Sequence, residues 1–92
     1  MKIKWSSAGW ADLDRLHAFL AEYDFDAADA AFDSLANAPT TLLSFPRRGS
    51  RLSQFDPREV RELGVSRYLL RYELSGTDLL VLRIFHAREE RQ

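Results

Sequence analysis

Hydrophobic residues recur at three- and four-residue spacing through the first third of the chain, at Trp10, Leu13, Leu16, Leu20 and Tyr23. This spacing places them on one face of a helix, while the charged residues of the same stretch fall elsewhere, at Asp12, Asp14, Arg15 and Glu22. Ser6 and Ser7 precede the pattern and offer an N-cap. The pattern predicts an amphipathic helix of about four turns.

A second helical pattern follows a break at Asp24–Asp26. Asp26 is a good N-cap, and Asp29 follows in a first turn where acidic side chains favour the helix dipole. One stripe of this helix carries Ala28, Ala31, Phe32 and Leu35. Small alanines there let two helices approach closely, so we predict an antiparallel helical hairpin over residues 8–38.

Pro39 should end or kink the second helix, because proline lacks the N–H that the helix needs. Leu35, Leu42 and Phe45 nevertheless keep a helical spacing across it. We therefore predict a kinked continuation of the helix to about Phe45.

Short β-prone segments flank the helical region. Ile3–Trp5 lies between lysines, as expected of an edge strand, and Val60–Leu63 reads as another short strand. Between the second helix and that strand, Pro46–Arg58 is a polar loop with only Leu52 and Phe55 as apolar anchors. Loops of this length in a compact domain are usually functional or mobile.

Two longer segments near the end of the chain alternate in the manner of strands. In the first, one face carries Tyr68, Leu70, Tyr72 and Leu74, and the other carries Leu69, Arg71 and Glu73. In the second, one face carries Leu80, Leu82 and Ile84, and the other carries Val81, Arg83 and Phe85. A three-residue loop at Ser75–Thr77 pairs the even-numbered faces, so that both arginines share the opposite face.

These elements predict one α+β domain over residues 1–92, in the order β-α-α-β-β-β, with the helical hairpin packed on one face of an antiparallel sheet. The chain has no cysteine, which excludes disulfides, thiolate chemistry and sulfur-bound zinc. His17 and His86 lack nearby partner ligands, so we expect no metal and no cofactor. The polar start and the absence of a long apolar run predict a cytoplasmic protein without a membrane span.

Charge is unevenly distributed along the chain. Residues 1–45 contain three basic and seven acidic residues, whereas residues 46–92 contain ten arginines and seven acidic residues. Every basic residue after Lys4 is an arginine apart from the two histidines. Arginine suits bidentate contacts with carboxylates and phosphates, so the C-terminal half either faces an acidic partner or neutralises the N-terminal half within the fold.

Four stretches of the chain, in order, resemble the ParE/RelE superfamily of type II toxin–antitoxin toxins. They are Trp5–Ala8 running into Ala11–Leu13, the turn Phe45–Gly49, the strand Val60–Leu63, and Arg67–Tyr72 answered by Leu82–Glu89. The series spans nearly the whole chain and matches the order of elements in that fold. It identifies the superfamily more specifically than either of its branches.

The resemblance implies a cognate, ParD-like antitoxin whose C-terminal segment wraps the toxin and whose N-terminal half is a ribbon-helix-helix DNA-binding dimer. It implies a hetero-oligomer of 2:2 or higher, in which the toxin itself reads no DNA sequence. An amphipathic partner needs an apolar groove or a free sheet edge rimmed by charge. The candidate antitoxin contacts are Trp5, Trp10, Phe25, Phe55 and Arg58; the alternative is that these aromatic side chains, and Phe19, simply form the core.

The two branches of the superfamily differ in function: RelE-like toxins cut mRNA on the ribosome, and ParE-like toxins stall DNA gyrase with its DNA cleaved. A nuclease needs a general base, a general acid and cations over the phosphate, which here point to His86, Arg71, Arg83 and Arg88. RelE-like toxins, however, use a lysine and arginine cluster and often a tyrosine near the C-terminus. This chain ends without tyrosine, carries Glu89 and Glu90 there, and has a pI near 6.1.

We therefore predict a ParE-like gyrase inhibitor that is not an enzyme, whose target contacts are Arg67, Arg71, Arg83, His86 and Arg88. A RelE-like ribosome-dependent endonuclease is the first alternative, and a non-toxic binding module of the same fold is the second. His86 at the end of a strand also fits a structural role. Arg71 and Arg83 also fit ion pairs with Glu73 or with an antitoxin carboxylate.

Overall fold

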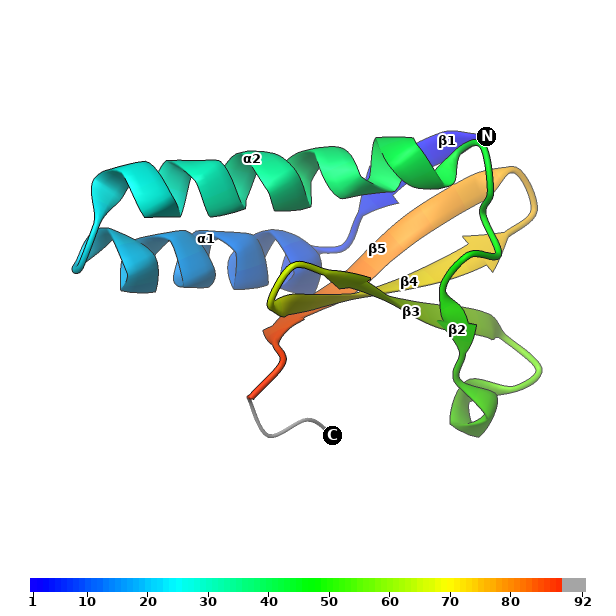
Figure 1. Ribbon diagram of the computed structural model, residues 1–92. Helices are drawn as coiled ribbons and strands as arrows, with labels where there is room; N and C mark the ends of the chain where they lie inside the picture. Colours follow the sequence, from blue (N-terminus) through cyan, green and yellow to red (C-terminus); the bar gives the residue numbers. More distant parts are fainter. Residues whose placement is uncertain (89–92) are drawn as a thin grey trace.

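Two helices lie side by side over one face of a five-stranded sheet in the computed structural model, which describes residues 1–88 (Figure 1). The elements are β1 (Lys2–Trp5), α1 (Ser7–Ala21), α2 (Phe25–Leu42), β2 (Ser50–Arg51), the 3-10 turn η1 (Ser53–Phe55), β3 (Glu59–Val65), β4 (Tyr68–Ser75) and β5 (Asp78–His86). Neither helix of this part of the chain is long and apolar enough to cross a membrane. Glu89 and Glu90, which entered the prediction above, lie outside the described residues.

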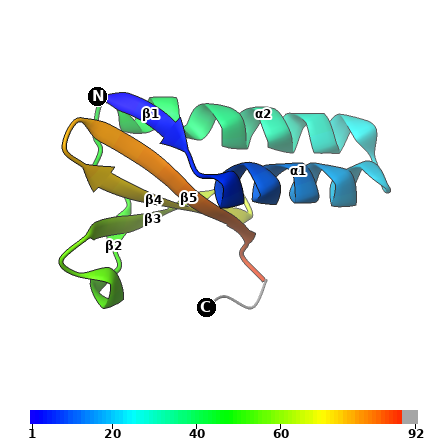
Figure 2. The same cartoon turned by 180° about the vertical axis from the view of Figure 1, so that it is seen from behind.

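The strands lie in the order β1-β5-β4-β3-β2. Neighbours from β2 to β5 are antiparallel, but β1 runs parallel to β5, with Lys2 opposite Asp78 and Trp5 opposite Val81 (Figure 2). The predicted α+β fold, its element order and the edge position of the first strand are confirmed. The sheet is mixed rather than wholly antiparallel, because the helical hairpin returns the chain to the far edge of the sheet.

Side-chain caps define where each helix begins. Ser6 caps α1 as predicted, and its Oγ accepts a hydrogen bond of 2.9 Å from the Gly9 N–H. The predicted cap of α2 was wrong, since Asp24 and not Asp26 caps it. Asp24 has an extended backbone, and its Oδ1 accepts from the N–H groups of Asp26 at 2.9 Å and Ala27 at 3.2 Å. Asp24 thus accepts hydrogen bonds from two N–H groups that have no partner within the helix, and Asp26 lies inside the first turn.

Helix α2 runs through Pro39 and ends at Leu42, somewhat before the predicted end at Phe45. Pro39 and Leu42 are buried, whereas Phe45 is 70% exposed. Burial of these two residues therefore offsets the hydrogen bond that proline cannot donate.

The core lies between the helices and the facing side of the sheet, and comprises Leu13, Leu16, Leu35, Ala38, Leu42, Leu70, Tyr72, Leu79, Val81 and Ile84. The predicted apolar face of α1 is only partly right. Trp10 and Tyr23 are 47% and 76% exposed, while Asp12 is 4% exposed. Helix α1 packs against β5 as well as against α2. Its buried face is therefore formed by Gly9, Asp12, Leu13 and Leu16.

The register between β4 and β5 contains a bulge. Ser75 pairs with Asp78 across a two-residue turn, and Arg71 pairs with Arg83 while Tyr72 pairs with Val81, which leaves Leu82 as the extra residue. The predicted three-residue loop and the shared face of Leu80, Leu82 and Ile84 were therefore wrong. Buried positions on the helix side are instead Leu79, Val81 and Ile84. The prediction that Arg71 and Arg83 share the opposite face is confirmed. The two-residue turn alone would place Arg83 on the other face, and the extra residue of the bulge brings it back beside Arg71.

Candidate functional site

A row of charged side chains crosses the sheet face turned away from the helices, where Glu62, Arg71 and Arg83 are direct neighbours on β3, β4 and β5. Arg71 is only 8% exposed, and its Nη2 lies 3.3 Å from Glu62 Oε2. Its Cζ lies 5.3 Å from the Phe55 ring centroid and 5.1 Å from that of Phe85. Two aromatic faces and a carboxylate thus stabilise a buried cation, which also holds η1 over the sheet.

Arg83 contacts both the sheet and α1, and its Cζ lies 5.1 Å from the Phe85 ring centroid. Its Nε and Nη2 lie 2.7 Å and 3.1 Å from the two carboxylate oxygens of Asp12. The Ile84 N–H donates to the same carboxylate at 2.8 Å. Ser6 completes this edge, because its N–H donates to Val81 O at 2.9 Å and its Oγ to Leu82 O at 2.8 Å. Ser6 and Asp12 therefore satisfy three backbone groups of β5 near the end of β1, namely Val81 O, Leu82 O and the Ile84 N–H.

His86 lies on the other face of β5, opposite Tyr68. The two rings meet edge to face with centroids 5.5 Å apart, and His86 Nδ1 accepts a 3.1 Å hydrogen bond from the Arg88 N–H. Burial raises the pKa of the Tyr68 hydroxyl. His86 is thus separated by the sheet from Arg71 and Arg83, so of the four residues considered as a nuclease constellation only His86 and Arg88 come together.

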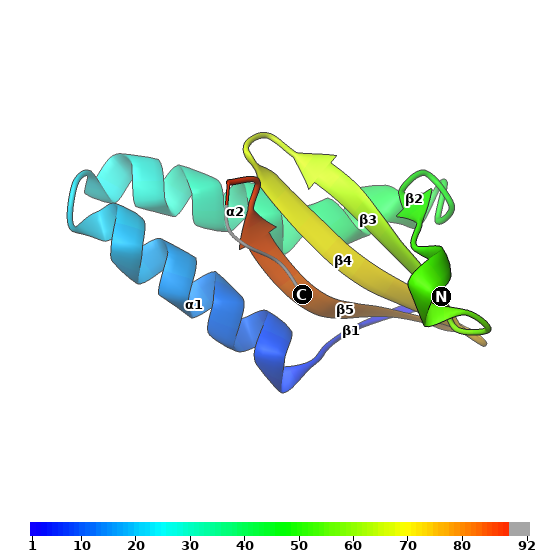
Figure 3. The same cartoon turned by 90° about the horizontal axis from the view of Figure 1, so that it is seen from below.

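Arg67, His86 and Arg88 gather at a groove of ≈ 610 Å³ between the second half of α1, the start of β4 and the end of β5. Figure 3 shows the backbone of these three elements from below. The α1–β5 groove is lined by Arg15, Leu16, Phe19, Leu20, Arg67, Tyr68, His86 and Arg88. The structure therefore divides the five predicted target contacts into two sets. Three line the groove, and Arg71 and Arg83 lie on the outer sheet face.

The five predicted antitoxin contacts occupy three separate places. Trp5 and Trp10 stack at the junction of β1 and α1, with ring centroids 4.5 Å apart. Phe25 begins α2 and is 70% exposed. Phe55 contacts Arg71 on the outer face, where Arg58 forms a bidentate pair with Glu73 at 2.8 and 3.1 Å. No single surface patch contains all five side chains.

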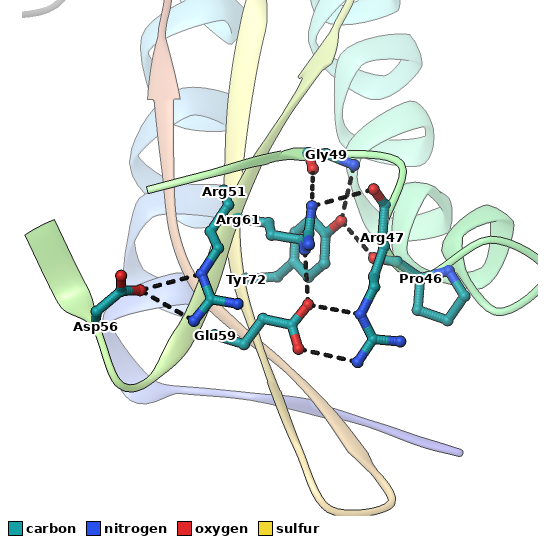
Figure 4. Close-up of polar contacts among 8 residues, drawn as sticks. All are labelled: Pro46, Arg47, Gly49, Arg51, Asp56, Glu59, Arg61 and Tyr72. Atoms are coloured by element: carbon teal, nitrogen blue, oxygen red, sulfur yellow. Dashed lines mark hydrogen bonds and ion pairs between the residues drawn. The ribbon is translucent and has the colours of Figure 1, made fainter. Parts of the chain in front are cut away.

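Tyr72 anchors the loop that leads from α2 into the sheet (Figure 4). Its hydroxyl donates to Pro46 O at 2.6 Å and accepts from the Gly49 N–H at 3.0 Å. A Cβ at Gly49 would lie 2.8 Å from the Tyr72 hydroxyl and 2.9 Å from Glu62 O, so only glycine fits there. The Phe45–Gly49 motif is thereby explained as a close approach of the backbone to the sheet.

Three charged side chains close the same loop over β3 (Figure 4). Arg61 Nη1 donates to Gly49 O at 2.8 Å and to Arg47 O at 3.2 Å. Glu59 accepts from Arg47 at 2.9 and 3.0 Å and from Arg61 at 2.9 Å. Hydrogen bonds from Arg47 and then Arg61 lower the pKa of Glu59. The segment predicted as a polar loop, Pro46–Arg58, therefore contains β2 and η1 and is tied to the sheet.

Sequence reasoning missed Asp12, Glu59 and Arg61 as organising residues. Asp12 had one available signal, since it lies next to Leu13 and four residues before Leu16 on the helix. Within residues 1–88, no group of three potential ligands is arranged to hold a metal ion. His17 instead joins the helices, with Nε2 2.9 Å from Asp29 Oδ1.

Comparison with known proteins gives consistent matches over almost the full length. The family model described as ParE toxin of type II toxin-antitoxin system, parDE, matches residues 3–91. Toxin RelE1 of Caulobacter vibrioides is 34% identical over 87 aligned residues, covering 87% of this chain and 86% of that protein.

Two solved structures are also similar to this chain. A chain of the chromosomal ParDE system of P. aeruginosa has a TM-score of 0.77 at 21% identity, covering 94% of this chain and 95% of its own. The conserved hypothetical protein HP0894 of Helicobacter pylori has a TM-score of 0.50 at 21% identity, covering 97% of each chain. At these identities the two structures support the fold alone.

Proposed function

The chain belongs to the ParE toxin family of type II toxin–antitoxin systems, and we propose that it inhibits DNA gyrase in the cytoplasm and is neutralised by a cognate ParD-like antitoxin. Inhibition of this kind requires a binding surface and no bond-breaking residues on the toxin. The alternatives within the superfamily are a RelE-like ribosome-dependent nuclease and a binding module without toxicity.

The placement of His86 relative to Arg71 and Arg83 is the observation that carries this proposal. General acid–base cleavage of RNA needs a proton-transferring group and cations around one phosphate. Here the imidazole lies on the helix side of β5 and both guanidinium groups lie on the other side. Arg71 is buried between two rings, and Arg83 is held by Asp12. This arrangement favours structural roles for the two arginines.

Charge supports the same conclusion. A protein that docks on ribosomal RNA gains affinity from excess positive charge, and this chain has a formal net charge of −1. A protein target tolerates that balance, because local complementarity and not net charge decides its recognition. The observation in favour of the nuclease is the name of the 34% identical relative, Toxin RelE1.

An antitoxin partner is supported by the family, whose model describes the toxin of a type II toxin-antitoxin system. We propose a hetero-oligomer of 2:2 or higher. Its antitoxin contacts are proposed at Trp5, Trp10, Phe25, Phe55 and Arg58. Arg67, His86 and Arg88 are the proposed target contacts on the groove. Arg71 and Arg83 are the proposed target contacts on the outer face, where the side chain of Arg83 is 45% exposed and Arg71 is 8% exposed.

A paired assay tests the proposal. Purified protein is added to a gyrase supercoiling reaction and, separately, to a cell-free translation reaction in which ribosome-bound mRNA is mapped for breaks. We expect inhibited supercoiling and intact mRNA. The nuclease would be established if supercoiling is not inhibited and the mRNA is cut by the natural protein but left uncut by the His86→Ala variant. A protein active in neither assay, yet bound by its antitoxin, would establish the binding module.

A further inference from the structure

The exposed face of α2 is built from short side chains. It consists of Asp26, Ala30, Asp33, Asn37, Thr40 and Thr41, which recur at helical spacing on the side opposite the buried Ala28, Leu35 and Leu42. Long charged side chains are the ones found most often on protein surfaces, yet α2 contains no lysine, arginine or glutamate. Short side chains let a second helix approach the backbone closely.

Large exposed hydrophobic side chains stand at both ends of this face. Phe25 begins α2, and Phe45 follows shortly after its last residue, Leu42; both are 70% exposed. Tyr23 accompanies Phe25 and is 76% exposed, and Leu43 accompanies Phe45 and is 39% exposed. Single exposed apolar residues are ordinary, whereas a cluster at each end of one exposed helix face marks an interaction surface.

The end of α2 at the hairpin tip is acidic. Residues 18–46 contain five acidic residues and no basic one, and Glu22, Asp24 and Asp26 lie at or just before the first turn of the helix. Asp24 caps the helix, whereas Glu22 and Asp26 are exposed. This end therefore combines exposed aromatic rings with negative charge.

The opposite end of α2 is basic and hollowed. A hollow of ≈ 630 Å³ is lined by Ser44, Phe45, Pro46, Arg47 and Arg48. Arg47 forms the pair with Glu59 described above, whereas Arg48 Nη2 donates to the neutral Thr41 hydroxyl at 2.9 Å. This contact lays the guanidinium of Arg48 against the exposed face of α2, and its further N–H groups can serve a carboxylate.

A second copy of the chain, placed antiparallel, complements both ends at once. With Leu35 at the centre of the contact, Phe25 of each copy lies opposite Phe45 of the other, and Glu22 lies opposite Arg48. The two ends are about 27 Å apart, since α2 has 18 residues with a rise of about 1.5 Å each. Because the same distance separates the ends in both copies, the two end contacts form together and are related by a twofold axis.

The same register is compatible with the middle of the helix. Ala30 lies opposite Thr40 of the other copy, and Asp33 lies opposite Asn37. The Asn37 side-chain amide donates one hydrogen bond to Asp33 O of its own helix at 2.8 Å. Its second N–H can donate to the Asp33 carboxylate of the other copy.

We propose that a second copy of this chain packs antiparallel on the exposed face of α2 and forms a twofold-symmetric dimer. The α1–β5 groove and the outer sheet face take no part in this contact, so it goes beyond the proposed function and requires neither antitoxin nor gyrase. One pair of helices makes a small interface, and we therefore expect a reversible dimer that depends on concentration.

Sedimentation velocity of the full chain over a concentration series tests the proposal. The mass should rise from 10.6 kDa toward twice that value. Phe25→Ser and Phe45→Ser should each weaken association by about tenfold or more, because each residue occurs twice in the dimer. Phe19→Ser is the matched control, since Phe19 is a 57% exposed aromatic residue on α1. Circular dichroism spectra establish that each variant is folded.

A charge exchange tests the two ends of the contact. Arg48→Glu and Glu22→Arg should each weaken association by about tenfold, and the double variant should recover most of the loss, because opposite charges again face each other. Arg51→Glu is the control, since it changes an exposed arginine away from α2.

Cysteine variants test the direction of the helices, because the natural chain contains no cysteine. A mixture of Ala30→Cys and Thr40→Cys, one of them carrying an affinity tag, should form a mixed disulfide on mild oxidation. Each variant alone should not, since two copies of either residue would lie about 15 Å apart and a disulfide needs Cα atoms within about 7 Å.

A mass of one chain at every concentration would overturn the proposal, as would equal association of the Phe25→Ser and Phe19→Ser variants. Disulfides formed by Ala30→Cys alone would show parallel helices and would also overturn it. All three measurements use the toxin alone, so their failure would leave the supercoiling result unaffected.

Discussion

Asp12 and Arg83 form a two-point ion pair between α1 and β5, with oxygen–nitrogen distances of 2.7 and 3.1 Å. The same carboxylate accepts the Ile84 N–H at 2.8 Å and lies 3.6 Å from Arg15. A buried acid in the first helix thus completes the edge of the last strand. Its role follows from long-range geometry, since the two paired residues lie 71 positions apart.

Replacing Asp12 by alanine should lower the free energy of unfolding by about 2–3 kcal/mol, because the buried Ile84 N–H loses its acceptor. Asp12→Asn should lose about 1 kcal/mol, since an amide oxygen still accepts that hydrogen bond. Urea denaturation measures both, and Asp14→Ala on the exposed side of the same helix is the control. Similar midpoints for Asp12→Ala and Asp14→Ala would contradict the role of Asp12.

Gly49→Ala should destabilise the protein by about 1–3 kcal/mol, because the new methyl would meet the Tyr72 hydroxyl at 2.8 Å and Glu62 O at 2.9 Å. Gly64 on β3 is the matched control, since a Cβ there has no neighbouring atom within 4 Å. Thermal unfolding compares the two variants. If Gly49→Ala melts as Gly64→Ala does, the loop has freedom to move away.

Tyr72→Phe should cost about 1–2 kcal/mol, because it removes the acceptor of the Gly49 N–H and the donor to Pro46 O while keeping the buried ring. Tyr23→Phe changes a hydroxyl on a residue that is 76% exposed and should cost almost nothing. Amide hydrogen exchange adds a local measurement, in which Gly49 should lose protection only in Tyr72→Phe. Retained protection would mean that the charged contacts alone hold the loop.

Acidification should destabilise the fold through Glu59. Its pKa in the folded protein lies below the ordinary value of 4.5, owing to hydrogen bonds from Arg47 and Arg61. Such a carboxylate contributes stability at pH values above its unfolded pKa, and the contribution is lost as the pH falls through the folded pKa. Glu73 beside Arg58 acts in the same direction.

The free energy of unfolding should therefore decline below about pH 5 in the natural protein, and less steeply in Glu59→Gln, which lacks the ionisable group. Urea titrations at a series of pH values measure this difference. Parallel declines in the two proteins would assign the acid sensitivity to other carboxyls.

Periodicity in the sequence identified both helices and the faces of β4, because each pattern is continuous there. It could not identify the face of β5, since Leu79, Leu80, Val81 and Leu82 are all apolar and any alternation fits them. A two-residue turn without the bulge would place Leu82 opposite Arg71. Only the pairing itself reveals the extra residue.

The candidate site was predictable only in part. Arg67, His86 and Arg88 were chosen from the sequence and do share a groove. The separation of His86 from Arg83 follows from strand alternation, because positions three apart point to opposite faces. The contributions of Arg15 and Phe19 depend on how α1 docks on the sheet, which no local pattern encodes.

The parallel pairing of β1 with β5 has a consequence for synthesis. A nascent chain that ends before Asp78 has no strand to pair with Lys2–Trp5 and no edge for Ser6 and Asp12 to complete. Within the described sheet β1 has β5 as its only neighbour, so the first strand cannot pair until β5 has been synthesised. Nonsense mutations before the codon of Asp78 should therefore leave an unfolded product and not a shortened toxin.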